Sequence, residues 1–253
     1  MAGRDEIVSF CDRLLAIEDF EDYGPNGLQV PGRLEVSRVA TGVTANRDFL
    51  AAAVESGAEL LIAHHGLFFG DGDCRLTEQL AGRLRIVLGA EASVAAYHLP
   101  LDAHREIGNN ALLCADLGLE LDPRPFGFVK GRAIGVVGTS GDGLTAAELA
   151  RRLAALTGRE PLHFDGGPEV VRRVGIVTGA GSSAIGEAAG GGLDAFVTGE
   201  PAEHVMGDAR ELGLHFLAAG HYATEVAGVR RLGEMLADRF GVEHEFVDVP
   251  NPV

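Results

Sequence analysis

Two adjacent histidines, His64 and His65, end an apolar run in the stretch ELLIAHHGLFF, residues 59–69. Neighbouring side chains along a strand point to opposite faces of the sheet, so a pair inside a strand would be divided between the two faces. At the carboxyl end of a strand the chain turns, Gly66 permits such a turn, and both rings can reach one point. Open α/β sheets place their sites at these ends. The pair is therefore either part of a ligand site or two unrelated histidines at a loop entry.

Further imidazoles and carboxylates follow later apolar runs. His221 and Glu225 are four residues apart, so they share one face of a helix that begins at HYATEVAGVRRL and can bind one ion together. Imidazoles combined with carboxylates suit zinc, iron or manganese. Three imidazoles and two carboxylates are enough for two ions about 3.5–4 Å apart, the spacing of dinuclear hydrolytic sites. The residues at these places are His64, His65, His98, Asp102, His221 and Glu225.

Each of these residues also has a simpler interpretation. A single histidine near a strand end is more often a packed or surface residue than a ligand, and Glu225 can be a solvated helix residue. The coincidence of all of them in equivalent positions of an internal repeat favours the metal site.

Apolar strand-like runs and alanine-rich helical stretches alternate along the chain, which predicts an α/β fold. A first helix is expected in DEIVSFCDRLLAIEDF, and the segment YGPNGLQVPG, 23–32, is expected to be a loop because Gly, Pro and Asn interrupt it. Another helix opens with Thr145 and Glu148 in a capping-box pattern. Strands are expected near 36–43, 59–63, 92–97, 133–139, 171–178, 194–198, 214–219 and 242–249.

An internal repeat organises these elements. The segment that starts at Val39 aligns without a gap with the segment that starts at Val174, strand to strand and helix to helix. Glycine and alanine align easily by chance, but polar residues interrupt both copies at the same places. We therefore expect two related α/β lobes, 1–125 and 126–253, with the metal site in the cleft between them. A second alignment, AAYHLPLD with AAGHYATE, places His98 opposite His221 and Asp102 opposite Glu225.

The composition limits the possible partners. Among 253 residues, 21 are Lys or Arg and 37 are Asp or Glu, for a formal charge of −16. Such a chain is not expected to bind nucleic acid or an anionic membrane, whereas it suits cations. Cys11, Cys74 and Cys114 lie far apart, which indicates reduced thiols in a cytoplasmic protein. The sequence opens with no signal peptide and holds no apolar run of membrane-spanning length.

Five blocks of the sequence are similar to the signature blocks of the Nif-three-like dinuclear metal-centre family, often labelled type-two GTP cyclohydrolase I. The blocks are GPNGLQV, LLIAHHGLFF, AYHLPLDAHREIGNNALL, TGEPAEH and AAGHYATEVAGV. The resemblance implies two α/β lobes and a ring-shaped homohexamer whose metal pairs face an internal cavity. It also implies the ligands His64, His65, Asp102, His221 and Glu225, with Glu225 bridging the two ions.

The chain departs from this family in two ways. Gly66 stands where many relatives have proline, and the inserted third domain of longer relatives is missing. Neither departure removes a ligand. The equivalence of His98 with His221 leaves two roles open for His98, a proton carrier beside the metals or a structural residue that supports its loop.

The functional prediction is a dinuclear metal-dependent hydrolase that acts on a nucleotide-like or cyclic amide substrate, GTP cyclohydrolase-like by resemblance only. The alternative is a non-enzymatic oligomer that stores or senses metal or acts as a scaffold. No Walker-type phosphate loop is present. The segment TGAGSSA, 178–184, is expected to be a tight turn first, an anion site second and a dinucleotide fingerprint last.

Overall fold

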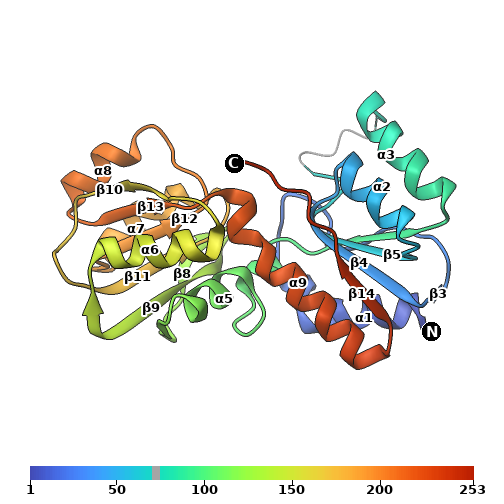
Figure 1. The fold of residues 1–253 in the computed structure, drawn as a ribbon, viewed down its shortest axis with the longest axis horizontal. Coiled ribbons are helices and arrows are strands. Elements are labelled where there is room, and N and C mark those ends of the chain that lie inside the picture. The colour runs from blue at the N-terminus through green and yellow to red at the C-terminus, as the bar shows by residue number, and fades with distance from the viewer. Residues whose placement is uncertain (70–74) are drawn as a thin grey trace. The chain divides into compact units, whose positions relative to one another are not determined.

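The computed structural model describes residues 1–69 and 75–253, and it has a mixed α/β architecture (Figure 1). The chain forms two compact units. Unit 1 comprises Met1–Leu101 and Gly228–Val249, and unit 2 comprises Asp102–Ala227 and Pro250–Val253. Cys74 lies outside the described residues.

Unit 1 is built on a five-stranded sheet in the order β14-β4-β5-β6-β2. The strands β14, β4, β5 and β6 run parallel, and β2 pairs antiparallel with β6 at the edge. A short antiparallel pair, β1 with β3, lies outside this sheet. The elements are β1 (Ala2–Gly3), α1 (Arg4–Leu14), η1 (Ile17–Asp19), β2 (Gly27–Val30), β3 (Glu35–Val36), β4 (Arg38–Thr44), α2 (Arg47–Glu55), β5 (Leu60–His65), α3 (Glu78–Gly89), β6 (Ser93–Ala96) and β14 (Glu243–Phe246). Two helices cross the boundary between the units, α4 (Leu99–Ala103) and α9 (His221–Phe240).

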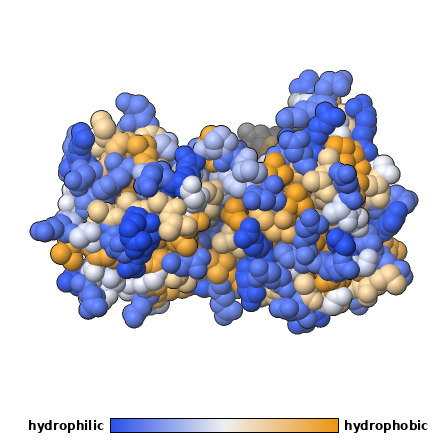
Figure 2. All heavy atoms as spheres, viewed as in Figure 1, coloured by the Kyte–Doolittle hydropathy of each residue, from blue (hydrophilic) through white to orange (hydrophobic). Residues whose placement is uncertain are grey.

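Alternation along the strands gives the sheet of unit 1 two apolar faces. Residues that lie side by side across the sheet, Ala40, Leu61 and Val94, pack with Phe49 and Leu50 of α2 in one core cluster. A sheet covered on both faces requires strands that are almost wholly apolar, which is why LLIA precedes the histidine pair. Charged and polar side chains cover much of the face shown in Figure 2.

Unit 2 is built on a seven-stranded sheet with the path β10-β13-β12-β11-β9-β7, and β8 pairs with β9. The central strands β11, β12 and β13 are parallel, whereas β9 and β10 flank them antiparallel. The elements are α5 (Asn109–Asp116), β7 (Glu120–Leu121), β8 (Phe126–Val129), β9 (Arg132–Leu144), α6 (Ala146–Thr157), β10 (Leu162–Phe164), β11 (Val171–Val177), η2 (Ser182–Ala184), α7 (Ile185–Gly190), β12 (Ala195–Thr198), α8 (Val205–Leu212) and β13 (His215–Ala218).

Helices α5 and α6 cover one face of the sheet of unit 2. Leu117, at the end of α5, and Leu149 from α6 are fully buried in one cluster with Val174 and Val197 from the strands. The helix start predicted at Thr145 is confirmed, since the Thr145 side chain accepts a hydrogen bond from the backbone N–H of Glu148 at 3.1 Å, while the Glu148 carboxylate accepts from Arg151 and Arg152. The other face carries a row of aromatic rings, Phe126, Phe196, Phe216 and Phe164, with successive centroids 5.9–6.0 Å apart.

The strand registers confirm the first alignment of the internal repeat. Val39 pairs with Leu60 in unit 1, and Val174 pairs with Ala195 in unit 2, so both strand–helix–strand segments span the same number of residues. The second alignment is wrong by one residue. In unit 1, Ile62 pairs with Ala95, and the first alignment places Ile62 opposite Val197 of unit 2. Val197 pairs with Leu217, so Ala95 corresponds to Leu217, whereas the second alignment places it opposite Ala218. His98 therefore corresponds to Gly220, and Asp102 to Thr224, rather than to the two residues expected.

The segment expected to be a loop, 23–32, contains a strand. Leu28 and Val30 join the ladder of β6, so β2 occupies the edge of the sheet in unit 1. The breakers Pro25 and Gly27 lie at or before the start of the strand, and an edge strand needs only one hydrogen-bonded side.

The compact units are not continuous along the chain. Unit 1 also includes residues 228–249, in which β14 pairs with β4. The two α/β lobes 1–125 and 126–253 stay a prediction. None of the helices in the described part of the chain has the length and apolar character that a membrane span requires.

Candidate metal centre

Three imidazole rings converge in unit 1 at the carboxyl ends of β5 and β6. The ring centroids of His64 and His65 are 4.8 Å apart, and His98 lies 5.0 Å from the first and 5.5 Å from the second. Each ring offers a nitrogen within 4.8 Å of the other two. We call these residues the three-histidine cluster. Adjacent positions of one strand thus reach one point because they are the last two residues of β5.

Each ring of the three-histidine cluster is held through its Nδ1 atom. His64, which is fully buried, contacts the backbone oxygen of Tyr97 at 2.9 Å. Because a carbonyl oxygen only accepts, Nδ1 of His64 carries the hydrogen and Nε2 carries the lone pair of the neutral ring. His65 Nδ1 lies 3.1 Å from the Thr44 hydroxyl.

His98 is oriented by a buried carboxylate. Its Nδ1 lies 2.7 Å from Oδ1 of Asp22, whose side chain is 2% exposed. The same carboxylate accepts hydrogen bonds from Asn26 Nδ2 at 2.9 Å and from the backbone N–H of Leu99 at 3.0 Å. Burial alone would raise the pKa of Asp22, but the hydrogen bonds and charge of its neighbours outweigh burial and lower that pKa. A carboxylate behind a histidine fixes the tautomer that presents Nε2 as a ligand or proton acceptor.

Two aromatic side chains border the three-histidine cluster. Phe69 lies 5.0 Å from His98 and 6.0 Å from His65, and Tyr23 lies 6.1 Å from His98. Tyr23 and Phe69 are stacked at 22° with about half of each residue exposed. Flat apolar surfaces of this kind can contact a planar ligand.

Unit 2 presents a histidine and two carboxylates at the start of α9. His221 Nε2 lies 3.1 Å from Oε2 of Glu225, as expected for residues four apart on one helical face, and Nδ1 lies 2.5 Å from Oε1 of Glu200. Burial would lower the pKa of His221, but the two carboxylates outweigh burial and raise it to about 9. Gly179 has a φ of +65°, and a Cβ atom there would lie 2.1 Å from Glu225 Oε1. The glycine therefore lets the backbone approach the buried carboxylate.

Asp102 is placed by a pair of asparagines in unit 2. The residue is 4% exposed, and its Oδ1 accepts a hydrogen bond from Asn109 Nδ2 at 2.8 Å. Asn110 donates to the backbone oxygens of Asp102 and Ile134, and its Oδ1 accepts from the N–H of Thr178. Asp102 lies in the one-turn helix α4, whose Pro100 occupies the first turn, where no N–H is needed.

The segment TGAGSSA forms a turn over residues 178–180 after β11 and ends in the short helix η2, which leads into α7. Two of its amides are bonded within unit 2, since Gly179 N–H donates to the Thr224 hydroxyl and Gly181 N–H donates to the Thr198 hydroxyl. The first expectation for the segment, a tight turn, is therefore confirmed for residues 178–180.

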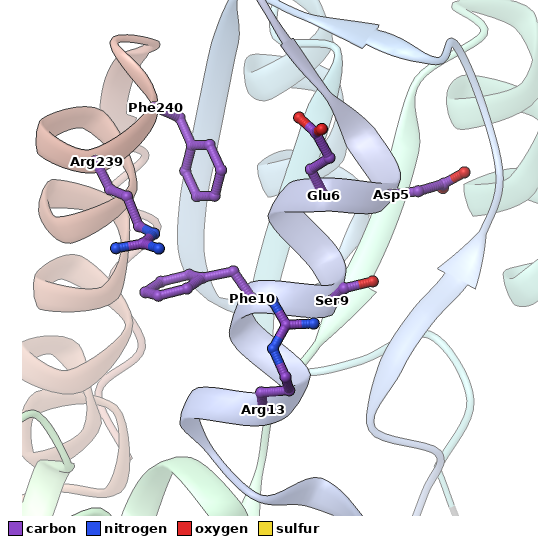
Figure 3. A pocket seen from close by; sticks show the side chains of 7 residues that line it. All are labelled: Asp5, Glu6, Ser9, Phe10, Arg13, Arg239 and Phe240. Carbon is purple, nitrogen blue, oxygen red and sulfur yellow. The ribbon is translucent and has the colours of Figure 1, made fainter.

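A surface pocket lies away from all of these residues, between α1 and the carboxyl-terminal part of α9 in unit 1 (Figure 3). It has a volume of about 540 Å³. The rings of Phe10 and Phe240 meet edge to face at 5.6 Å, and the Arg239 guanidinium lies 4.5 Å from the centre of the Phe10 ring. The pocket holds none of the candidate ligands.

Comparison with known proteins identifies the family of the chain. The sequence profile of the family described as Duf34/NIF3 (NGG1p interacting factor 3) matches residues 2–252. The chain belongs to the DUF34/NIF3 family. Proteins called "GTP cyclohydrolase 1 type 2 homolog" are 42% identical in Pseudomonas aeruginosa, over 97% of each chain, and 44% identical in Escherichia coli K12, over 98% of each chain.

Solved structures of the DUF34/NIF3 kind have the same fold. A structural-genomics protein called ybgI, described as of unknown function, superposes with a TM-score of 0.93 at 40% identity, and the two chains cover each other completely. A protein from Thermus thermophilus superposes with a TM-score of 0.90 at 37% identity, again over the whole of both chains.

The residues expected to bind metal thus form local groups. Within unit 1, His64, His65 and His98 come together, and within unit 2, His221 and Glu225 are in contact. Several supporting residues escaped sequence reasoning, namely Asp22, Asn26, Asn109, Asn110 and Glu200. Asn26, the pair Asn109 and Asn110, and Glu200 lie inside the quoted blocks, whereas no spacing in the sequence links Asp22 to His98.

Proposed function

We propose that the chain binds two divalent transition-metal ions, zinc, iron or manganese, and uses them to hydrolyse a small substrate. The proposed ligands are His64, His65, Asp102, His221 and Glu225. Glu225 would be shared between the two ions. The observation that carries the proposal is the three-histidine cluster, in which each ring is held through Nδ1. The names of the relatives and the family membership support the same conclusion.

The donors of each unit fit such ions by their chemistry. His64 has the tautomer that puts the lone pair on Nε2, the usual state of a metal-binding histidine, and the same tautomer of His98 leaves its Nε2 able to accept a proton. In unit 2, the pKa of His221 is raised because two carboxylates surround the ring, and the same negative charge would stabilise a cation. A buried carboxylate such as Glu225 needs positive charge nearby.

The chain's own residues have distinct roles in this proposal. When bound, two ions of this kind supply a nucleophilic water at neutral pH and polarise the bond under attack. His98 moves the proton, because Asp22 holds its Nδ1 and leaves Nε2 to exchange a proton with the substrate. Tyr23 and Phe69 stack on a planar ring, which favours a nucleotide-like or cyclic amide substrate.

The experiment has two stages. The protein is purified without chelators and its metal is counted; close to two ions per chain are expected, and a protein that cannot be loaded with zinc, iron or manganese would contradict the proposal. The loaded protein is then screened against GTP and other nucleotides, cyclic amides and phosphodiesters. Turnover that disappears in Glu225→Gln, while circular dichroism stays unchanged, supports the hydrolase. Two ions without turnover would favour a metal store, sensor or scaffold.

The protein is further proposed to assemble as a homohexamer in the cytoplasm. The basis is its family resemblance, together with a cysteine pattern that suits reduced thiols. Light scattering should give the mass of six chains at micromolar concentration. A monomer at every concentration would contradict the hexamer without affecting the metal proposal.

A further inference from the structure

A second group of potential ligands lies at the edge strand of unit 2. Strand β10 pairs antiparallel with β13, with His163 opposite Leu217 and Phe164 opposite Phe216. Extended by one residue, this register puts Asp165 opposite His215. Residues two apart on a strand point to the same face, so His163, Asp165 and His215 share one face of the strand pair. We call these residues the edge cluster.

The distances within the edge cluster match a tetrahedral ion. His215 Nδ1 lies 3.3 Å from His163 Nε2 and 3.1 Å from Asp165 Oδ1, and all three ligand atoms lie within 4.8 Å of one another. Zinc bonds of 2.0–2.2 Å in tetrahedral geometry separate neighbouring ligand atoms by about 3.3–3.5 Å. A direct hydrogen bond between two imidazoles would normally be shorter than 3.3 Å.

The tautomer of His215 points to a cation in the edge cluster. Its Nε2 lies 2.9 Å from the backbone oxygen of Pro168, which only accepts, so Nε2 carries a hydrogen. Nδ1 of the neutral ring then holds a lone pair that faces the Asp165 carboxylate at 3.1 Å. Two acceptors approach this closely when a positive particle, a metal ion or a proton, lies between them.

The loop after β10 is shaped to hold His215 in this orientation. The His215 side chain is only 5% exposed, whereas that of Asp165 is 81% exposed. A Cβ atom on Gly167 would lie 2.5 Å from the His215 ring, so the loop can lie against the ring only because this residue is glycine. The buried ring is fixed, and the exposed carboxylate leaves a path by which an ion can enter.

We propose that His163, Asp165 and His215 form a mononuclear site for a borderline divalent cation of the zinc type. Two imidazoles and one carboxylate leave a fourth position open to water, as in zinc sites that exchange or react. His215 begins β13 and His221 follows its other end, which places this site apart from the ligands at the start of α9.

Zinc titration of the full chain tests the edge cluster. We compare wild type with His163→Ala, with Asp165→Asn and with a matched control, His204→Ala. His204 is an exposed histidine of the same unit that lies 3.8 Å from Asp208 but has no place in the edge cluster. His163→Ala and Asp165→Asn should each weaken one zinc equivalent at least tenfold, and His204→Ala should weaken none. Because the Asp165 side chain is exposed, Asp165→Asn keeps the test available if His163→Ala does not fold.

Two further measurements separate this site from the proposed dinuclear centre and from simple protonation. Glu225→Gln should retain the zinc equivalent that His163→Ala loses, whatever the fate of the dinuclear centre. The ¹⁵N resonance of His215 Nδ1 should shift on addition of zinc at constant pH. Equal zinc binding by wild type, His163→Ala and Asp165→Asn would overturn the proposal. So would a His215 resonance that responds to pH but not to zinc, because a proton would then occupy the position.

Discussion

Replacing Asp22 by asparagine tests how the three-histidine cluster is oriented. The carboxylate accepts four hydrogen bonds, two at Oδ1 from His98 Nδ1 and Tyr23 N–H, and two at Oδ2 from Asn26 and Leu99 N–H. An asparagine amide has one accepting oxygen and one donating nitrogen, so two of these donors must face another donor. The most favourable rotamer of the asparagine places its amide oxygen at the Oδ2 position and its amide nitrogen at the Oδ1 position. The N–H of Tyr23 can then bond to water, and His98 can change its tautomer so that Nδ1 accepts a hydrogen bond from the amide.

The expected effect follows from these contacts. Losing a buried, charge-assisted hydrogen bond costs about 2 kcal/mol. For a chain of this size, Tm should fall by roughly 2–4 °C per kcal/mol, hence by roughly 4–8 °C. The changed tautomer puts the proton on Nε2 of His98, a residue that supports the proposed ligands His64 and His65, and loss of such a supporting contact should lower metal affinity about 10–100-fold. Because folding lowers the pKa of Asp22, its contribution is present above the ordinary value of 3.8 and lost only as the pH falls below it.

Glu59→Gln is the matched control for this variant. Glu59 precedes β5 at the end opposite the histidines and accepts hydrogen bonds from the Ser37 and Arg38 amides. It should lose stability without a change in metal affinity or in the His98 tautomer. Thermal unfolding, zinc titration and long-range ¹H–¹⁵N spectra of the histidine rings give the three readouts. An unchanged His98 tautomer with unchanged metal affinity in Asp22→Asn would refute the reasoning.

The other predictions concern single contacts. Glu225→Gln should lose more metal than His64→Ala, since a bridging carboxylate serves both ions; equal loss by elemental analysis would argue against bridging. Thr145→Ala should cost about 1 kcal/mol in urea unfolding, because the first turn of α6 loses its cap, and an unchanged midpoint would contradict this. Cys11 and Cys114 should resist alkylation at pH 8 until the protein unfolds, because burial raises their pKa to about 12 and about 11; mass spectrometry locates the label, and rapid modification of either in native protein would disprove it.

Much of the fold was readable in the sequence because the strands are covered on both faces. Runs such as LLIA and VGIV are apolar throughout, which distinguishes strands of a parallel sheet from amphipathic helices. The first alignment of the repeat succeeded for the same reason, since it spans a complete strand–helix–strand unit. Strand β2 was missed because Pro25 and Gly27 suggested a loop, whereas pairing with β6 supplied the stabilisation that local propensity lacks.

Candidate ligands are easier to recognise in the sequence than the residues that orient them. Histidine and glutamate at strand ends have a chemistry that spacing alone reveals, as with His221 and Glu225. Asp22 has no such spacing, because 76 residues separate it from His98 along the chain. Asp22 and His98 meet because the loop before β2 lies against the end of β6 in the folded chain. Long-range polar contacts of this kind depend on tertiary structure.

The one-residue error in the second alignment has a chemical consequence. Because His98 corresponds to Gly220 and not to His221, the two copies of the repeat do not supply equivalent ligands. Unit 1 gathers three imidazoles, of which His64 and His98 have tautomers fixed by a carbonyl and a carboxylate. Among the ligands proposed for the two ions, unit 2 holds two buried carboxylates, Asp102 and Glu225, and one imidazole, His221, which lies between Glu200 and Glu225. The candidate donors of the two units therefore differ in kind, neutral imidazoles in unit 1 and mainly carboxylates in unit 2, and of these only the carboxylates can offset the charge of a divalent cation.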